Sequence, residues 1–218
     1  NGFGWQSLNS LRTYAVTWGD WDNDGDLDLA VANENSAEVY VNNGTALNAT
    51  SAWQSTEFST MRDAAWGDWD NDGDLDLAVA NNSIPTRVYE NDGGTLHLDP
   101  DNGLGWEAPV DAVDGFIGDR YVNGEDVEWG DWDGDGDLDL ALAVPDDIVV
   151  TGEGPIGVRG VRVFENDGGT LTLDLLSNLG WASPGETFTN AIAWADVDND
   201  GDLDLATANR SASILLYV

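Results

Sequence analysis

The sequence contains no cysteine and no lysine, and it has a single histidine, His97. The absence of cysteine excludes disulfides, thiolate metal sites and cysteine nucleophiles. With one histidine and no lysine, the chain also lacks the residues from which most nucleophile–base pairs are built. We therefore expect no catalytic residues, and we predict that the protein is not an enzyme.

Positive charge and long hydrophobic runs are also scarce. Seven arginines stand against 42 acidic residues, which gives a formal net charge of −35. Such a polyanion repels nucleic acids and anionic membrane surfaces, because phosphate binding needs clustered cations. No apolar run approaches the roughly 18 residues of a membrane span. We expect neither a nucleic-acid partner nor a membrane span, whereas eleven tryptophans and a hydrophobic content of 41% indicate a folded core.

Four copies of one unit make up most of the chain. They share the pattern W-[GA]-D-x-D-x-D-G-D-L-D-L-A, and they begin at Trp18, Trp66, Trp129 and Trp194. The spacing between copies is unequal, although the pattern itself keeps its length. Each copy is therefore one supersecondary unit, and the units are joined by loops of variable length.

The residue pattern inside each unit is typical of β-strands. Leu27, Leu29 and Val31 alternate with small or acidic residues, and a short apolar strand ending in tryptophan precedes each acidic loop. A Val-Tyr-like strand, an Asn-Asp-Gly-Gly-like turn and a last strand ending near Trp53 or its equivalents follow. Four strands per unit without helical periodicity predict an all-β fold, a β-propeller of four-stranded blades. The four repeats form a small closed ring or part of a larger propeller.

We expect one propeller domain over residues 1–218, with units at about 11–57, 58–108, 109–183 and 184–218. The last unit ends on its third strand. The segment Gly2-Phe3-Gly4-Trp5 matches the fourth-strand segment Gly103-Leu104-Gly105-Trp106, so residues 1–7 are expected to supply the missing strand. The pairing can occur within one chain, which we favour, or with a neighbouring chain, which would give self-association by terminal strand exchange.

Each unit carries a D-x-D-x-D-G-x-x-D loop. Five aspartates within nine residues repel one another unless a cation neutralises them. Carboxylates at positions 1, 3 and 5 point into one concavity, glycine at position 6 permits a sharp turn, position 7 offers its carbonyl, and the aspartate at position 9 closes the shell. A set of oxygen ligands in a flexible loop favours Ca²⁺ over Mg²⁺. A merely solvated acidic turn would explain one copy, but four copies in register argue against it.

The sequence therefore predicts four Ca²⁺ sites. Their residues are Asp20, Asp22, Asp24, Asp26 and Asp28; Asp68, Asp70, Asp72, Asp74 and Asp76; Asp131, Asp133, Asp135, Asp137 and Asp139; and Asp196, Asp198, Asp200, Asp202 and Asp204.

These loops and the strands around them resemble the FG-GAP/VCBS repeats of integrin α-subunit propellers and of many secreted bacterial proteins, over nearly the whole chain. Of the pieces that give the family its name, only Phe3-Gly4 and Ala108-Pro109 are present. Integrin-type propellers usually have seven blades, more than the four units here. The resemblance implies cation ligands at loop positions 1, 3, 5, 7 and 9. It also implies an extracellular or cell-surface Ca²⁺-stabilised scaffold for adhesion or ligand binding.

Three functions compete on this basis. The first is a non-catalytic adhesion, ligand-binding or assembly module with a protein or glycan ligand outside the cell. The second is a lectin-like glycan binder, and the third is a carbohydrate-active enzyme that uses two of the many carboxylates. All eleven tryptophans recur at fixed repeat positions, which favours blade packing over a sugar-stacking platform. The first function is therefore our prediction.

Two departures from the repeat are candidate ligand loops, because binding residues often lie on loops of a rigid scaffold. Residues 109–125 and 145–160 are insertions in the third unit, and they bring Phe116, Arg120, Tyr121 and Arg159. Four N-glycosylation sequons also occur near predicted turns, at Asn43, Asn48, Asn81 and Asn209.

Overall fold

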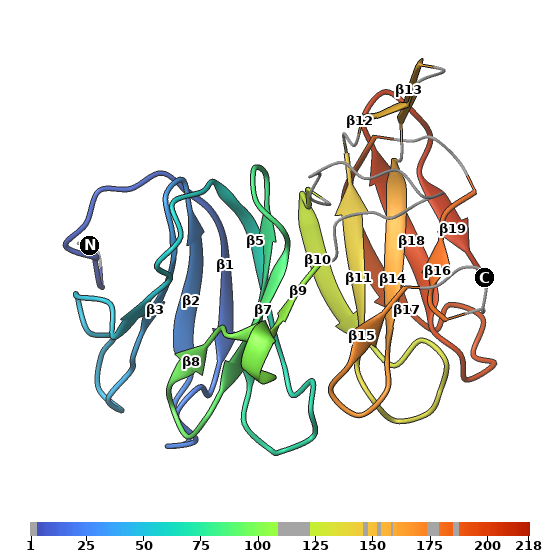
Figure 1. Cartoon of the computed structure of the whole chain (residues 1–218). Coiled ribbons are helices and arrows are strands. Elements are labelled where there is room, and N and C mark those ends of the chain that lie inside the picture. The colour runs from blue at the N-terminus through green and yellow to red at the C-terminus, as the bar shows by residue number, and fades with distance from the viewer. Residues whose placement is uncertain are drawn as a thin grey trace.

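The computed structural model describes residues 4–108, 123–145, 148–151, 154–157, 159–173, 179–184 and 188–218. Within these ranges the chain is almost entirely β-structure, and its helical part is a 3-10 turn at Pro100–Asn102. Four antiparallel sheets form the blades of a β-propeller, which confirms the predicted fold class (Figure 1). None of the described segments forms a helix that could cross a bilayer.

Each blade follows one repeat unit. The first contains β1 (Thr13–Gly19), β2 (Asp28–Asn33), β3 (Ala37–Tyr40) and β4 (Trp53–Gln54). The second contains β5 (Met61–Gly67), β6 (Asp76–Asn81), β7 (Arg87–Asn91), β8 (Leu96–His97) and β9 (Trp106–Glu107). The third contains β10 (Asp126–Gly130), β11 (Asp139–Val144), β14 (Gly160–Asn166), β15 (Leu171–Thr172) and β16 (Trp181–Ala182). The described part of the fourth contains β17 (Thr189–Ala195), β18 (Asp204–Asn209) and β19 (Leu215–Tyr217).

The insertions of the third unit lie only partly within the described residues. The second of them contains a separate hairpin of β12 (Ile148–Thr151) and β13 (Gly154–Gly157). Phe116, Arg120 and Tyr121, which we selected as candidate ligand residues, lie outside the described ranges. The guanidinium of Arg159 lies 3.9 Å from the centre of the Phe188 ring, so this arginine packs against the chain.

The inner hairpin of every blade holds its acidic loop in the same way. Gly19 lies opposite Asp28 in the β1–β2 pair, and Gly67 lies opposite Asp76 in the β5–β6 pair. The third and fourth blades repeat this register. Because the registers agree, the acidic loops lie at one end of the propeller, and the β5–β6 and β10–β11 loops project from its lower edge in Figure 1.

The hydrophobic core lies between neighbouring blades. The small residues Ala30 and Ala32 on one face of β2 share a buried cluster with Leu77 of β6. The same arrangement joins the second blade to the third and the third to the fourth. The sheets of the second and third blades are thus buried on both faces, which explains the nearly continuous apolar character of β6 and β11.

A tryptophan of each later blade packs on a glycine of the blade before it. The pairs are Gly19 with Trp66, Gly67 with Trp129 and Gly130 with Trp194. A Cβ atom at any of these glycines would lie 2.7 to 2.9 Å from an atom of the indole ring. A side chain at these positions would therefore force the blades apart, and glycine permits the close approach. This group of tryptophans serves blade packing, as the repeat-locked positions predicted.

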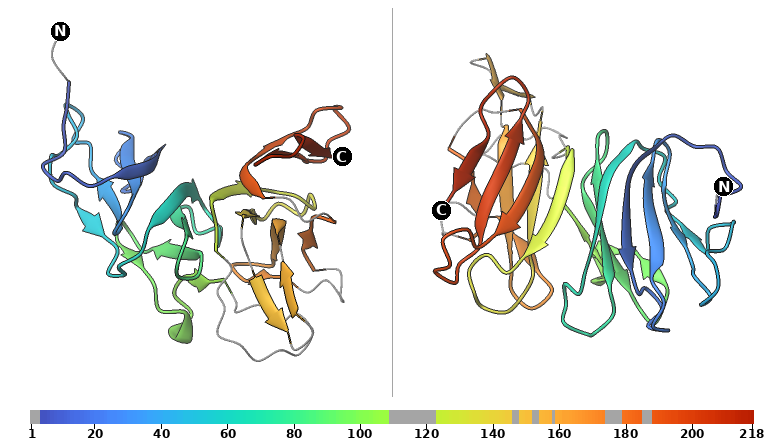
Figure 2. Two further views of the ribbon diagram at one scale, coloured as in Figure 1. Left: turned by 90° about the horizontal axis from the view of Figure 1, so that it is seen from above. Right: turned by 180° about the vertical axis from the view of Figure 1, so that it is seen from behind.

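The four blades lie along an open arc, with the first blade at one tip and the fourth at the other (Figure 2). β1 contacts β5, β5 contacts β10, and β10 contacts β17, so neighbours in sequence are neighbours in space. Trp5 packs edge-to-face on Tyr40 of the first blade, with ring centroids 5.3 Å apart. The described part of the fourth blade has three strands, and its completion by residues 1–7 stays a prediction.

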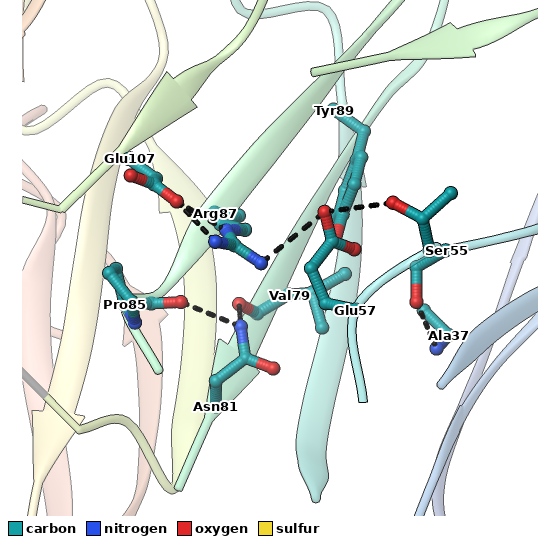
Figure 3. A network of polar contacts seen from close by, with 10 residues as sticks. Ala37, Ser55, Glu57, Val79, Asn81, Pro85, Arg87, Tyr89 and Glu107 are labelled. Carbon is teal, nitrogen blue, oxygen red and sulfur yellow. Dashed lines mark hydrogen bonds and ion pairs between the residues drawn. The ribbon is translucent and has the colours of Figure 1, made fainter. Parts of the chain in front are cut away.

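A partly buried polar network attaches the segment between the first two blades to the second blade (Figure 3). Arg87 on β7 donates through Nε to Glu107 on β9 at 2.7 Å and approaches Glu57 in the connection at 3.4 Å. Tyr89 donates to the same Glu57 at 2.8 Å. Asn81 is fully buried nearby and donates to the carbonyls of Val79 and Pro85. The sequon at Asn81 is therefore closed to glycosylation in the folded chain.

A cavity of about 320 Å³ lies between the innermost strands of the first three blades. It is lined in part by Asp63, Asp126 and Glu128. Asp63 accepts a hydrogen bond from the N–H of Val127 at 3.1 Å, and Asp126 accepts one from the N–H of Ile192 at 2.6 Å. Each aspartate thus links its own blade to the next.

Burial raises the pKa of the Asp126 carboxyl above its ordinary value of 3.8, and the neighbouring Asp63 and Glu128 raise it further. The Asp126 carboxyl therefore binds its proton more tightly in the folded state than in the unfolded chain. As the pH rises above 3.8, ionisation of this carboxyl increasingly lowers the free energy of unfolding. Asp126→Asn keeps an oxygen for Ile192 without the charge. We expect it to raise the melting temperature by about 3 °C near pH 8, with the gain vanishing towards about pH 4.

The exposed turn residue Asp92 provides the control, because Asp92→Asn removes the same charge outside the cavity. Thermal unfolding of both variants is compared across this pH range at constant Ca²⁺. A pH-independent gain shared by both variants would contradict the effect of burial and would indicate only the relief of general repulsion.

Candidate metal centres

The backbone of each acidic loop is bent by residues in the left-handed region. Gly25, at loop position 6 of the first blade, has a φ of 92°, and Asn23 at position 4 has a φ of 57°. The other three loops repeat these conformations, with glycine in place of asparagine at position 134. Glycine and asparagine tolerate positive φ better than other residues, so the sequence motif is also a conformational requirement.

The structure brings three carboxylates of each loop together, those at positions 1, 3 and 9. The groups are Asp20, Asp22 and Asp28; Asp68, Asp70 and Asp76; Asp131, Asp133 and Asp139; and Asp196, Asp198 and Asp204. In every group the candidate ligand atoms lie within 4.8 Å of one another. Three anionic oxygens at such distances can share one cation, and without a cation they repel one another.

The carboxylate at position 1 shows how a cation would fit. One oxygen of Asp20 accepts the N–H of Gly25 at 3.0 Å, which closes the loop. Its other oxygen, Oδ1, is buried and has no hydrogen-bond donor. The Oδ1 atoms of Asp68 and Asp131 are buried and unpaired in the same way. Since buried polar atoms in folded proteins normally have partners, these orphaned oxygens fit a metal ligand role.

The carboxylate at position 9 connects the loop to the third strand of its blade. In the second blade, Asp76 accepts from the N–H of Trp69 at 2.9 Å and of Asn91 at 2.8 Å. Burial outweighs these hydrogen bonds and raises the pKa of Asp76 to about 7. In the third blade, burial raises the pKa of Asp139 to about 6. A bound cation would favour the ionised form of both groups.

The carboxylates at positions 5 and 7 lie outside the triads. Position 5 comprises Asp24, Asp72, Asp135 and Asp200, and position 7 comprises Asp26, Asp74, Asp137 and Asp202. At position 5, one oxygen of Asp24 accepts the N–H of Asp26 at 2.9 Å. The assignment of these residues as ligands stays a prediction, with position 7 using its carbonyl.

Side chains at position 7 join neighbouring loops, a role that the sequence pattern did not reveal. Asp74 accepts from the side-chain amide of Asn23 in the preceding blade at 2.6 Å and from the N–H of Gly93 in its own blade at 2.9 Å. Asp137 repeats both bonds with Asn71 and Gly168. Asparagine at position 4 recurs in three loops, and that recurrence was the available signal.

A second set of asparagines also escaped the sequence analysis. Asn91 donates to the carbonyls of Trp21 in the preceding blade and Leu75 in its own, at 2.9 and 3.1 Å. Asn166 makes the equivalent bonds in the third blade. His97 lies exposed in β8, as expected for an ordinary strand residue.

Comparison with known proteins agrees with the geometry of the repeats. Residues 20–79, which run from the first acidic loop into β6, match the FG-GAP-like repeat family. No curated protein matches the sequence of this chain. The propeller resembles a chain in the crystal structure of BBS1N in complex with ARL6DN, soaked with lead, at 15% identity and a TM-score of 0.57. The match covers 97% of the present chain and 55% of that chain, and it shows the fold alone.

The hydrogen bonds between neighbouring acidic loops generate a prediction with an internal control. Asp74→Ala and Asp137→Ala each remove two hydrogen bonds, so we expect each to lower the free energy of unfolding by about 1–2 kcal/mol. Asp26→Ala should cost less, because no described asparagine of a preceding blade bonds to Asp26. Urea unfolding in Ca²⁺ measures all three. Equal losses would mean that the side chain at position 7 matters only within its own loop.

Proposed function

We propose that this protein is a Ca²⁺-stabilised, non-catalytic binding module that acts outside the cell in adhesion, ligand binding or assembly, with a protein or glycan ligand. The observation that carries the proposal is the buried, unpaired Oδ1 atom at loop position 1, found in three of four equivalent carboxylate triads. The cation would be held mainly by positions 1, 3 and 9. It would supply charge neutralisation and order to each loop, and no reaction step is assigned to it.

The donor set supports Ca²⁺ as the cation. Every candidate ligand is a carboxylate or a backbone carbonyl, and the set contains no nitrogen or sulfur. Ca²⁺ accepts six to eight such oxygens at variable angles, whereas Mg²⁺ needs a near-ideal octahedron and retains more water. Four Ca²⁺ ions would also reduce the repulsion in a chain with a net charge of −35.

A binding role outside the cell rests on the family likeness and on the rigidity of the scaffold. Acidic loops and hairpin turns are joined from blade to blade, so loops elsewhere on the propeller would be held in fixed positions. Ligand sites commonly lie on such loops. Asp63 and Asp126, which line the cavity between the first three blades, accept backbone hydrogen bonds, which argues against their use as a free acid–base pair.

Calcium removal tests the proposal directly. A ligand that binds only the folded state stabilises it by about 4 kcal/mol at a thousandfold excess over Kd. We expect a chelator to lower the melting temperature by about 10 °C or more, and Ca²⁺ rather than Mg²⁺ to restore it. An unchanged melting curve in excess chelator would contradict the assignment of Ca²⁺.

Calorimetric titration of a single-loop variant locates the ions. Asp68→Asn keeps an oxygen for the N–H of Gly73 but replaces the anionic carboxylate. We expect it to bind one ion fewer than the wild type, whereas Asp92→Asn in an exposed turn should bind the full number. If both variants bound equally, position 1 would not be a ligand.

The ligand class is tested on the calcium-loaded chain. Binding to a glycan array would identify a lectin-like module, and measurable turnover of a polysaccharide would overturn the non-catalytic assignment.

A further inference from the structure

The outer turn of one blade lies against the acidic loop of the blade before it. The turn between β7 and β8 contains Gly93 and Gly94, and a Cβ atom added at Gly94 would lie 3.4 Å from the Cβ atom of Asp22 in the first loop. In the third blade, a Cβ atom at Gly169 would lie 3.1 Å from that of Asp70 in the second loop. Each turn thus lies close to the position-3 aspartate of the neighbouring triad.

The carboxylate of Asp74 joins this turn and the first loop to the second loop. Its Oδ1 atom accepts from the side-chain amide of Asn23 at 2.6 Å, and its Oδ2 atom accepts from the N–H of Gly93 at 2.9 Å. Asp74 also donates its own N–H to Asp72 at 2.8 Å, a bond within the second loop. Because Asn23 directly follows Asp22, a continuous series of contacts runs from the first triad to the second loop.

The same contacts join the second loop to the third. Asp137 accepts from the side-chain amide of Asn71 at 2.7 Å and from the N–H of Gly168 at 2.9 Å. Asn71 directly follows Asp70, the position-3 aspartate of the second triad. The arrangement therefore repeats at two successive interfaces.

The interface between the third and fourth loops lacks the amide. Gly134 stands at position 4 of the third loop, where its φ of 77° keeps the left-handed conformation of the asparagines. At position 7 of the fourth loop, Asp202 donates its N–H to Asp200, and no side-chain amide of a described residue reaches its carboxylate. The chain thus contains two bridged pairs of loops and one pair that is not bridged.

We propose that Asn23 and Asn71 couple neighbouring cation loops, so that Ca²⁺ in one loop raises the Ca²⁺ affinity of the loop of the next blade. This inference rests on the proposed binding of Ca²⁺ by the loops. When the first triad is filled, the segment after Asp22 is fixed, and Asn23 then holds Asp74 in place. The carbonyl of Asp74 is an expected ligand of the second site, so part of the ordering cost of that site is already met.

Repulsion between bound cations opposes this coupling and has a different pattern. Cations in neighbouring loops repel one another at every interface, whereas the amide bridge occurs at two of the three. Coupling between two sites is also reciprocal, so each loop of a bridged pair supports the other. We therefore expect the first three loops to bind Ca²⁺ cooperatively and the fourth to bind it independently of the third.

A titration that resolves the single loops tests the coupling. The position-6 amides of Gly25, Gly73 and Gly201 each donate to the position-1 carboxylate of their own loop, so their NMR resonances report the sites separately. Asn23→Gly removes the bridging amide and keeps a residue that tolerates positive φ. We expect it to lower the Ca²⁺ affinity reported by Gly73 about fivefold or more, while the affinity reported by Gly201 stays unchanged.

Asn199→Gly is the matched control, because it makes the same substitution at a φ of 61° in the fourth loop. It should leave the affinity reported by Gly73 unchanged. A second arm disables the first site with Asp20→Asn, which keeps an oxygen for the N–H of Gly25 but removes the anionic ligand. Asp20→Asn should lower the affinity reported by Gly73 in the wild-type background and have little further effect alongside Asn23→Gly.

The coupling is overturned if Asn23→Gly leaves the affinity reported by Gly73 unchanged, or if Asn199→Gly lowers it as much. It is also overturned if Asp20→Asn lowers that affinity equally in both backgrounds, since the sites would then interact by charge alone. These results would leave the Ca²⁺ assignment intact. A Gly73 resonance that does not respond to Ca²⁺ in the wild-type chain would instead overturn the proposed function, and the coupling with it.

Discussion

The buried aspartate at loop position 9 is the group on which each blade depends. In the first blade, Asp28 accepts backbone N–H groups from Trp21 in the acidic loop and from Asn42 beyond the third strand. The Asp28 carboxylate thus links the acidic loop, β2 and the residues that follow β3. Its burial makes ionisation costly, and the neighbouring loop carboxylates add to that cost. A cation at the triad would reverse this penalty and would couple the fold of the blade to the charge of its loop.

Contacts between blades extend this dependence along the chain. Asn23 of the first blade donates a hydrogen bond to Asp74 in the acidic loop of the second blade. Asn91, the last residue of β7 in the second blade, donates one to the carbonyl of Trp21 in the first. Trp66 meanwhile packs on Gly19 near the same loop. Polar and apolar contacts therefore fix one blade against the next at the same place. Order in one loop supports order in its neighbours, as expected for a repeat protein whose stability resides in nearest-neighbour interfaces.

The fourth blade departs from its predecessors on the side that faces away from them. Ala195 and Val197 stand where the earlier blades have glycine and tryptophan. Both residues are exposed in the described structure. Gly134 likewise replaces the position-4 asparagine in the third loop, so the third blade lacks the side-chain amide that joins the earlier loops. Coupling between loops is accordingly weakest at the last interface.

The sequence by itself determined the repeat unit and the strands around it. It predicted carboxylates at positions 1, 3, 5 and 9 around one concavity, and the structure groups those at positions 1, 3 and 9. These follow from local rules: an alternation of period two, tryptophan before the loop, and glycine or asparagine where φ is positive. It did not indicate that Asn23 and Asp74 join separate loops, or that Asn91 reaches a neighbouring blade, because these partners are far apart in the chain and their pairing depends on the stacking geometry. The curvature of the arc and the resulting separation of Trp5 from β19 were likewise decided only by tertiary structure, since both accumulate from the packing angles of successive blades.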